Sequence, residues 1–349
     1  MINTNADKIY KAVGAEAVLT EQADLRYYLT GFESSFGYVL SDKSGSVFFT
    51  DARYIEAAES ALNGTGIKVK IFEGSAVGML QNYKEVAVPL ARTYYPDYIK
   101  LSEAGLSVKD SFPAFNQAMS IKQPYELNNI KTACKIADRA FEALLGKIKE
   151  GISENELAAE LEYLMRKFGA SGASFDTIVA FGSNSSVPHH ETGDTRLRFG
   201  DPVLIDFGCK ANGYCSDCTR TFLFGDRGGN EDFKTAYAHV LEAHMRVKEK
   251  LTEGMTGSQA DAIAREYLKE KKLDRYFTHS LGHGIGINIH EFPALSTKSG
   301  SILKNGMVFS DEPGVYFKGG FGIRIEDTVT LENGAVKSLT DSDKQLIIL

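Results

Sequence analysis

The stretch from Val203 to Phe222 reads VLIDFGCKANGYCSDCTRTF and holds two aspartates, Asp206 and Asp217, on either side of Asn212-Gly213. Apolar residues flank this turn-forming dipeptide, so the stretch is typical of an antiparallel hairpin. A turn centred between Ala211 and Asn212 places Asp206 directly opposite Asp217, with Cβ atoms about 4.5–5.5 Å apart. Like charges so placed among apolar neighbours destabilise the pair. A divalent cation shared by the two carboxylates resolves this conflict.

A second pair of carboxylates, Glu312 and Glu326, is related in the same way around Gly319. The loop Lys318-Gly319-Gly320 fits a three-residue hairpin turn with glycine in the left-handed position. Glu312 then faces Glu326, and Arg324 lies on the same face as Glu326, because strand side chains alternate. A single buried carboxylate is more often hydrogen-bonded than metal-bound. Two pairs in corresponding hairpins, however, predict four converging carboxylates and a metal site.

The cysteines of the first hairpin are the competing candidates for a metal or redox site. Cys215 and Cys218 lie three residues apart and therefore point to opposite faces of a regular strand. A zinc ribbon also needs a second such pair, which Cys134 and Cys209 do not supply. We therefore expect all four cysteines to be small buried apolar residues.

The histidines lie only in the second half of the chain. Three of them fall in the glycine-rich run THSLGHGIGINIHEFP, where glycine allows close approach of the backbone. A lone histidine is more often a core or surface residue, but this run indicates a site. The candidates are His279, His283 and His290, with His189 and His190 in the earlier segment SSVPHHET. Two further histidines fall in a predicted helix and are assigned no role: His239 and His244.

The chain has 349 residues, which favours two domains. Strand-like and helix-like segments alternate at first, as in a small α/β domain. Ser111–Pro124 contains two prolines and is interpreted as a linker. Beyond it, the order helix, helix, hairpin occurs twice and suggests an internal duplication. We expect a small N-terminal domain over 1–120 and a catalytic domain over 121–349.

Capping patterns define the helices of the second half. Pro124 can open a helix that runs to about Lys149. Ser153 and Glu156 form a capping-box pattern for the next helix. Two later helices are predicted over Glu231–Leu251 and Ser258–Lys271.

Composition excludes several classes of partner. The net charge is −7 and no run of Lys or Arg stands out, so we expect no nucleic acid partner. No apolar run approaches the ~20 residues that span a bilayer, so we expect no membrane partner. The first residues, MINTNADKIYK, lack the apolar core of a signal peptide. With four cysteines that form no disulfide framework, we expect a cytoplasmic protein with reduced thiols.

The motifs that carry these candidates resemble those of the pita-bread metallopeptidases. All five ligand positions of that family are present in order, over roughly Pro124 to the C-terminus. The N-terminal segments DLRYYLTGF and FTDARY also resemble the family's Xaa-Pro members. The resemblance implies a small α/β creatinase-type N-terminal domain followed by an α+β pita-bread (creatinase/aminopeptidase-like) catalytic domain. The ligand motifs are LIDFG with Asp206, SDCTRTF with Asp217, GHGIG with His283, DEPGVY with Glu312 and GIRIED with Glu326.

The resemblance also implies a centre of two divalent metal ions. Asp206 would hold one ion, Asp217 and Glu326 would bridge both, and His283 and Glu312 would complete the second. Oxygen-rich ligation with one imidazole suits Mn²⁺, with Co²⁺, Fe²⁺ or Zn²⁺ as alternatives. Two such ions can activate a water and stabilise a tetrahedral intermediate. Glu312 would pass the proton of that water to the leaving amine.

Further site residues follow from the same resemblance. His189, His279 and His290 would line the substrate pocket and stabilise the intermediate, with His189 and His290 binding substrate. Tyr316 and Arg324 match positions near the site, where Tyr316 would contact substrate and Arg324 would orient carboxylates or substrate. His190 adjoins a matched position without aligning to it.

Within the family, the Xaa-Pro group fits best, because methionine aminopeptidases usually lack the additional N-terminal domain. After Pro293 the sequence has Ala294 and Leu295, without the arginine that some prolidases place there. We therefore expect a Xaa-Pro aminopeptidase acting on peptides with proline in second position, with a Xaa-Pro dipeptidase (prolidase) as the alternative. A non-peptidase binding module and a creatinase-like hydrolase are disfavoured by the intact ligand set. The resemblance also suggests a homodimer in which the N-terminal domain limits access to the site.

Overall fold

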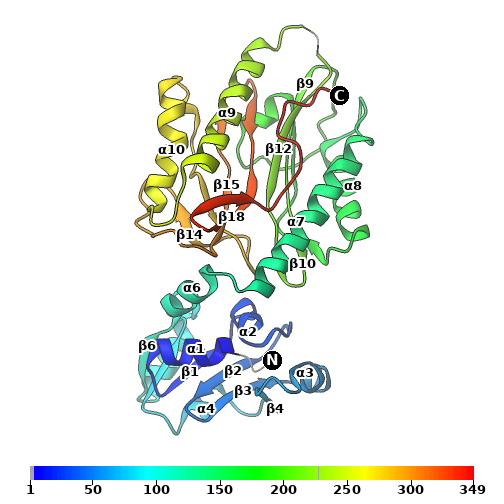
Figure 1. Ribbon diagram of the computed structural model, residues 1–349. Helices are drawn as coiled ribbons and strands as arrows, with labels where there is room; N and C mark the ends of the chain where they lie inside the picture. Colours follow the sequence, from blue (N-terminus) through cyan, green and yellow to red (C-terminus); the bar gives the residue numbers. More distant parts are fainter. Residues whose placement is uncertain (1–3, 227) are drawn as a thin grey trace. The chain divides into compact units, whose positions relative to one another are not determined.

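The computed structural model describes residues 4–226 and 228–349, and the chain divides into two compact units, Met1–Met119 and Ser120–Leu349. The first unit is drawn in blue to cyan in Figure 1, and the second runs on to red. Residues 1–3 of the expected N-terminal domain lie outside the described residues. In the part of the chain that is described, no helix has the length and apolar character needed to pass through a bilayer.

A six-stranded sheet forms the core of the N-terminal unit, in the order β4-β3-β2-β1-β5-β6. Strand β2 runs antiparallel to both of its neighbours, whereas the other pairs are parallel, which confirms the expected α/β architecture. The strands are β1 (Ala17–Thr20), β2 (Tyr38–Asp42), β3 (Gly45–Thr50), β4 (Lys68–Ile71), β5 (Glu85–Val88) and β6 (Ser107–Asp110). The helices are α1 (Thr4–Val13), α2 (Ala23–Thr30), α3 (Ile55–Leu62), α4 (Ala76–Leu80), η1 (Leu90–Arg92), α5 (Tyr95–Glu103) and α6 (Phe112–Ser120).

The prediction of a linker over Ser111–Pro124 is wrong, because most of this segment forms helix α6. Pro113 is the second residue of that helix, where a missing N–H costs no hydrogen bond. Phe115 is fully buried, and its ring centroid lies 6.4 Å from that of Tyr28. The two prolines therefore mark two helix starts and not an irregular segment.

Four long helices and several antiparallel strands form the C-terminal unit, and helix pairs precede strands twice, as predicted. The helices are α7 (Pro124–Leu145), α8 (Glu154–Lys167), α9 (Glu231–Lys250) and α10 (Gly257–Glu270), with η2 (Gly182–Ser186) and η3 (Asp274–Tyr276). The first group of strands is β7 (Gly172–Ala173), β8 (Ile178–Phe181), β9 (Asp201–Phe207), β10 (Cys209–Ala211), β11 (Tyr214–Cys215) and β12 (Cys218–Phe224). The second group is β13 (Gly282–Gly284), β14 (Glu291–Leu295), β15 (Val308–Asp311), β16 (Gly314–Tyr316), β17 (Gly322–Arg324), β18 (Asp327–Glu332) and β19 (Ala335–Ser338).

Each helix pair packs on its own sheet. Helices α7 and α8 share an apolar core with the sheet β12-β9-β8, in which Phe141 stacks on Phe207 with ring centroids 5.3 Å apart. Helices α9 and α10 share a second core with the sheet β14-β13-β15-β18-β19. The predicted capping box is confirmed, since Ser153 accepts from the Glu156 N–H and Glu156 accepts from the Ser153 N–H.

The first hairpin forms, but its register differs from the prediction. Asp206 on β9 pairs with Thr219 on β12, and β10 and β11 continue the same register. Asn212 and Gly213 occupy both central positions of a two-residue turn, with φ of 49° and 78°. The turn centre therefore lies between them. The prediction that Asp206 directly faces Asp217 is wrong, because Asp217 lies two residues before Thr219.

The second hairpin has the predicted register. Strands β16 and β17 pair Gly314 with Arg324, and β15 and β18 pair Asp311 with Asp327. These pairs enclose the positions of Glu312 and Glu326, so the two carboxylates oppose one another. Gly319, with φ of 73°, takes the left-handed position of the turn.

All four cysteines are buried and free, which confirms the expectation from strand alternation. Cys209 and Cys218 belong to the core beneath α7 and α8.

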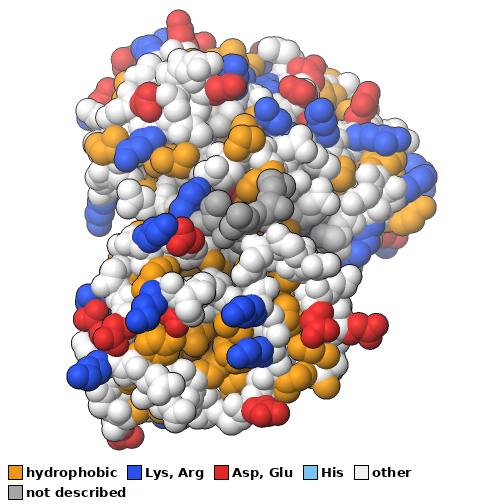
Figure 2. Space-filling view, turned by 60° about the horizontal axis from the view of Figure 1, so that its bottom comes forward, with side chains coloured by type: hydrophobic (Ala, Val, Ile, Leu, Met, Phe, Trp, Pro, Cys, Tyr) orange, Lys and Arg blue, Asp and Glu red, His pale blue; other side chains and the backbone are white. Residues whose placement is uncertain are grey.

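On the face shown in Figure 2, acidic and basic side chains are interspersed among hydrophobic ones.

Candidate metal centre

A cavity of about 440 Å³ in the C-terminal unit collects most of the predicted site residues. Both hairpins contribute to it, together with the glycine-rich segment around β13 and the loop before β9. The predicted residues that line it are His189, Asp206, Asp217, His279, His283, His290, Glu312, Arg324 and Glu326. Tyr316 does not line the cavity but contacts two residues that do.

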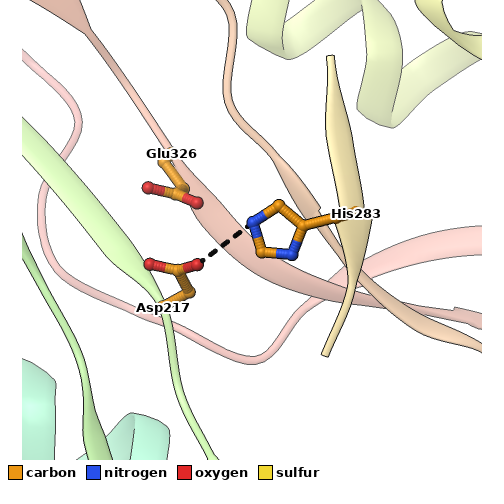
Figure 3. A group of neighbouring side chains, drawn as sticks. All are labelled: Asp217, His283 and Glu326. Atoms are coloured by element: carbon orange, nitrogen blue, oxygen red, sulfur yellow. Dashed lines mark ion pairs between the residues drawn. The ribbon is translucent and has the colours of Figure 1, made fainter. Parts of the chain in front are cut away.

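Three of the lining residues form a close cluster: Asp217, His283 and Glu326. One ligand atom from each lies within 4.8 Å of the other two (Figure 3). Asp217 is held through its backbone, because its N–H donates to the Thr328 hydroxyl and its carbonyl accepts from the same hydroxyl. His283 lies on β13, whereas Asp217 immediately precedes β12 and Glu326 immediately precedes β18, so their convergence depends on both hairpins.

His283 faces the carboxylates with an unprotonated nitrogen. Burial lowers the pKa of His283 to about 4, so its ring is neutral at pH 7. Its Nδ1 lies 3.2 Å from the Gly284 carbonyl oxygen, which can only accept, and therefore carries the proton. Nε2 then presents a lone pair to Asp217 and Glu312, whose oxygens lie 3.5 Å away. Acceptors that face one another in this way fit a cation between them.

Glycine is required beside His283. A Cβ on Gly282 would lie 2.0 Å from the Ser310 carbonyl oxygen, so only glycine lets β13 approach β15 here. The Ser310 hydroxyl accepts from the His283 N–H at 3.0 Å and donates to Glu312 Oε1 at 3.1 Å. Ser310 therefore fixes the spacing between two of the candidate ligands.

The carboxylates of the cavity are buried close together and repel one another when they are ionised. Burial raises the pKa of Asp217 and of Glu326 well above the usual range, and the neighbouring carboxylates raise both further. Burial also raises the pKa of Glu312 to about 8. A divalent cation converts this repulsion into shared ligation.

Asp206 has one satisfied and one unsatisfied oxygen. Its Oδ2 accepts from Arg324 Nη2 at 2.6 Å. Its Oδ1 is buried and has no hydrogen-bond partner among the described residues. An orphaned carboxylate oxygen in a cavity with three other carboxylates fits a metal ligand.

Thr219 joins the two hairpins and was missed by the sequence analysis. Its hydroxyl donates to Glu326 Oε2 at 2.6 Å and accepts from Arg324 Nε at 3.0 Å. Strand alternation could have found it, because Thr219 lies two residues after Asp217 on the same face. Arg324 therefore orients Asp206 directly and Glu326 through Thr219.

A hydrogen-bond chain runs from Arg324 through Tyr316 to His279. Burial, reinforced by the charge of Arg324, lowers the pKa of His279 to about 3. Its Nδ1 lies 2.8 Å from the Ser280 carbonyl oxygen and therefore carries the single proton. Nε2 accepts from the Tyr316 hydroxyl at 2.9 Å, and this hydroxyl accepts from Arg324 Nη1 at 2.6 Å. The chain fixes the tautomer of His279.

His290 and His189 lie on the cavity wall. The ring centroid of His290 is 4.2 Å from that of His283, and burial lowers the pKa of His290. The next residue, Glu291, forms a buried ion pair with Lys122 at 2.8 Å. This pair anchors the segment that carries His290.

Glu154 organises the loop that carries His189, and the sequence analysis missed this role. Its buried carboxylate accepts from the Phe181 N–H at 2.8 Å, from Asn184 Nδ2 at 2.9 Å and from the Gly193 N–H at 3.1 Å. It also lies 2.9 Å from His190 Nε2. His190 is therefore engaged with Glu154, whereas His189 lines the cavity.

Known proteins match the whole chain. Residues 128–333 match the family described as "Metallopeptidase family M24", and residues 4–111 match the "Creatinase/Prolidase N-terminal domain". A Xaa-Pro dipeptidase of Pyrococcus furiosus is 36% identical, over 92% of each chain. Solved structures that share the fold include the following two. The Xaa-Pro dipeptidase from Bacillus anthracis has a TM-score of 0.94 at 35% identity and 99% coverage of each chain. The X-Pro aminopeptidase from Thermotoga maritima has a TM-score of 0.90 at 33% identity, over 98% of this chain and 100% of that one.

Proposed function

The chain belongs to metallopeptidase family M24, and we propose that it removes the N-terminal residue from peptides with proline in second position. The observation that carries this proposal is the convergence of four carboxylates and the neutral imidazole of His283 in one cavity. Relatives named as Xaa-Pro peptidases cover nearly the whole chain, which supports the same reaction here.

We propose five ligands for two divalent ions, with Mn²⁺ as the expected metal and Co²⁺, Fe²⁺ or Zn²⁺ as alternatives. The unsatisfied Oδ1 of Asp206 and the acceptor Nε2 of His283 support this assignment. When bound, the ions supply Lewis-acid polarisation of the scissile carbonyl and activation of water. The proposed ligands are Asp206, Asp217, His283, Glu312 and Glu326.

The remaining residues of the cavity are assigned to proton transfer and substrate binding. We propose that Glu312 takes the proton of the attacking water and delivers it to the leaving amine. His189 and His290 bind the substrate backbone from the cavity wall. His279 stabilises the tetrahedral intermediate, and Arg324 orients carboxylates or substrate. Tyr316 holds both in place and supports substrate binding through them.

The choice between aminopeptidase and dipeptidase depends on the capture of a free carboxylate. A dipeptidase must bind the carboxylate of its second residue. Among the described residues that line the cavity, Arg324 is the only Arg or Lys, and it is engaged by Asp206 and Tyr316. Ala294, which follows Pro293 where some prolidases place an arginine, lines the cavity. These observations favour the aminopeptidase, whereas the names of two relatives favour the dipeptidase.

Three peptides test the proposal on enzyme reconstituted with Mn²⁺: Ala-Pro, Ala-Pro-Ala and Ala-Ala-Ala. We expect cleavage of Ala-Pro-Ala and little cleavage of Ala-Ala-Ala. Turnover of Ala-Pro alone would replace the aminopeptidase with the dipeptidase. Equal turnover of Ala-Pro-Ala and Ala-Ala-Ala would contradict the preference for proline.

We also propose a homodimer in a reducing, cytoplasmic compartment. Four buried free cysteines fit such a compartment. Light scattering on the purified chain tests the dimer, and a monomer mass would contradict it.

A further inference from the structure

A buried histidine, His244, lies between two carboxylates outside the cavity. Its Nδ1 is 3.1 Å from Asp311 Oδ2, and its Nε2 is 3.4 Å from Asp327 Oδ2. All three residues are fully buried. The imidazole comes from helix α9, whereas the carboxylates come from β15 and β18. One side chain thus contacts both strands.

The two strands are those that carry candidate metal ligands. Asp311 immediately precedes Glu312, and Asp327 immediately follows Glu326. Asp311 and Asp327 pair directly across the sheet. Side chains alternate along a strand, so this pair points away from the cavity while Glu312 and Glu326 line it. Two carboxylate pairs therefore lie back to back.

The pair behind the cavity needs positive charge, because like charges directly opposite one another in a sheet repel. Asp327 also contacts Arg220 Nη2 at 2.8 Å, Lys344 Nζ at 3.1 Å and the Ser338 hydroxyl at 2.6 Å. Asp311 makes no hydrogen bond among the described residues, and its charge contact is with His244. His244 is therefore the group that balances Asp311.

Two observations support a protonated His244. Both of its nitrogens lie within ion-pair distance of a carboxylate oxygen, without hydrogen-bond geometry, and a neutral ring would turn one lone pair toward a carboxylate. Although burial acts against the charged form, Asp311 and Asp327 raise the pKa of His244 to about 9. Arg220 extends the same network to β12, since its Nη1 donates to the carbonyl oxygens of Thr219 and Glu326.

We propose that His244 is a positioning residue for the metal centre. Its imidazole binds Asp311 and Asp327 and so holds β15 and β18 at the spacing that brings Glu312 and Glu326 onto the same metal ions. This inference rests on the proposed metal centre. It assigns to His244 no contact with substrate or metal.

The test is a calorimetric titration of metal-free protein with Mn²⁺, in the wild type and in His244→Gln. Groups that orient metal ligands typically contribute 10–100-fold to metal affinity. We expect His244→Gln to weaken Mn²⁺ binding by at least about 10-fold and to change the visible absorption spectrum of the Co²⁺ form. His239→Gln is the matched control, because His239 lies on the same helix and contacts Tyr267 instead, with Nδ1 3.0 Å from its hydroxyl. We expect wild-type affinity for this control.

A second variant, Asp311→Asn, keeps the test decisive if His244→Gln does not fold. It removes the carboxylate charge that faces His244 Nδ1, and we expect weaker Mn²⁺ binding as well. The double variant should bind no more weakly than His244→Gln alone, because both changes act through one contact. Wild-type affinity in a folded His244→Gln or Asp311→Asn, or additive losses in the double variant, would overturn the inference. A wild type that binds no Mn²⁺ would instead overturn the proposed function.

Discussion

Arg324 Nη2 lies 2.6 Å from Asp206 Oδ2, so the one arginine among the described lining residues is bound to a candidate metal ligand. The same guanidinium reaches Tyr316 and Thr219. Arg324→Lys keeps the charge but loses the planar fork that makes these contacts together. We expect kcat/KM to fall by at least about 100-fold, or about 2.7 kcal/mol. Arg246→Lys, on the surface of α9, is the control and should leave kcat/KM unchanged, whereas near wild-type kcat/KM in Arg324→Lys would remove Arg324 from the mechanism.

Tyr316→Phe removes the hydroxyl that joins Arg324 Nη1 to His279 Nε2. Buried Arg324 and half-buried His279 are then each left with an unused hydrogen-bonding group, at a cost of about 1–3 kcal/mol. We expect kcat to fall by about 10-fold while Mn²⁺ content stays at the wild-type level. Steady-state kinetics and elemental analysis check both values. An unchanged kcat would show that the hydrogen-bond chain has no catalytic effect.

Glu154→Gln alters the buried carboxylate that holds the loop before β9. The substitution keeps the size of the side chain but replaces an acceptor oxygen with a donor, so one loop contact is lost. We expect KM to rise by about 5-fold, which corresponds to about 1 kcal/mol, with metal content unchanged. Glu160→Gln, on the same helix but half-buried and paired with Lys147, should leave KM unchanged. A lower kcat with unchanged KM would contradict the assignment of this loop to substrate binding.

The pKa of His244 also predicts how stability depends on pH. It is about 9 in the folded chain and about 6.5 for an unperturbed histidine. Because folding raises this pKa, the stabilisation is fully present below pH ~6.5 and is lost as the pH rises through about 9. We expect Tm to fall over this range and to fall less in His244→Gln. An equal pH dependence in both proteins would contradict a charged His244. His244 faces Asp311 and Asp327, and Asp327 in turn contacts Lys248, Arg220 and Lys344.

Local sequence patterns predicted the second hairpin but not the register of the first. A three-residue hairpin loop has few geometries and needs a left-handed residue, which Gly319 supplies, so the pairing of Glu312 with Glu326 followed. For the first hairpin, Asn212 and Gly213 both take left-handed conformations, which moves the turn centre. The convergence of the four carboxylates survives this shift, because Asp217 remains on the same face as Thr219.

Two residues whose roles were not predicted, Glu154 and His244, act across long separations in the chain. Glu154 holds residues of a distant loop, and His244 contacts two strands far from its helix. Each lies in an unremarkable helical pattern, so no local motif marks it. Only the folded structure shows that these carboxylate and imidazole groups are buried against charged or polar partners.

The central claim, that Asp217 helps to hold two divalent ions needed for peptide cleavage, is tested most directly by metal content. Wild type and Asp217→Asn would be reconstituted with Mn²⁺, desalted and measured by elemental analysis, with activity on Ala-Pro-Ala recorded in parallel. We predict about two ions per chain and full activity in the wild type, with both lost on chelation. Asp217→Asn should keep its fold by circular dichroism but lose metal and activity. A wild type that retains activity without metal, or an Asp217→Asn variant with full metal content and activity, would contradict this account.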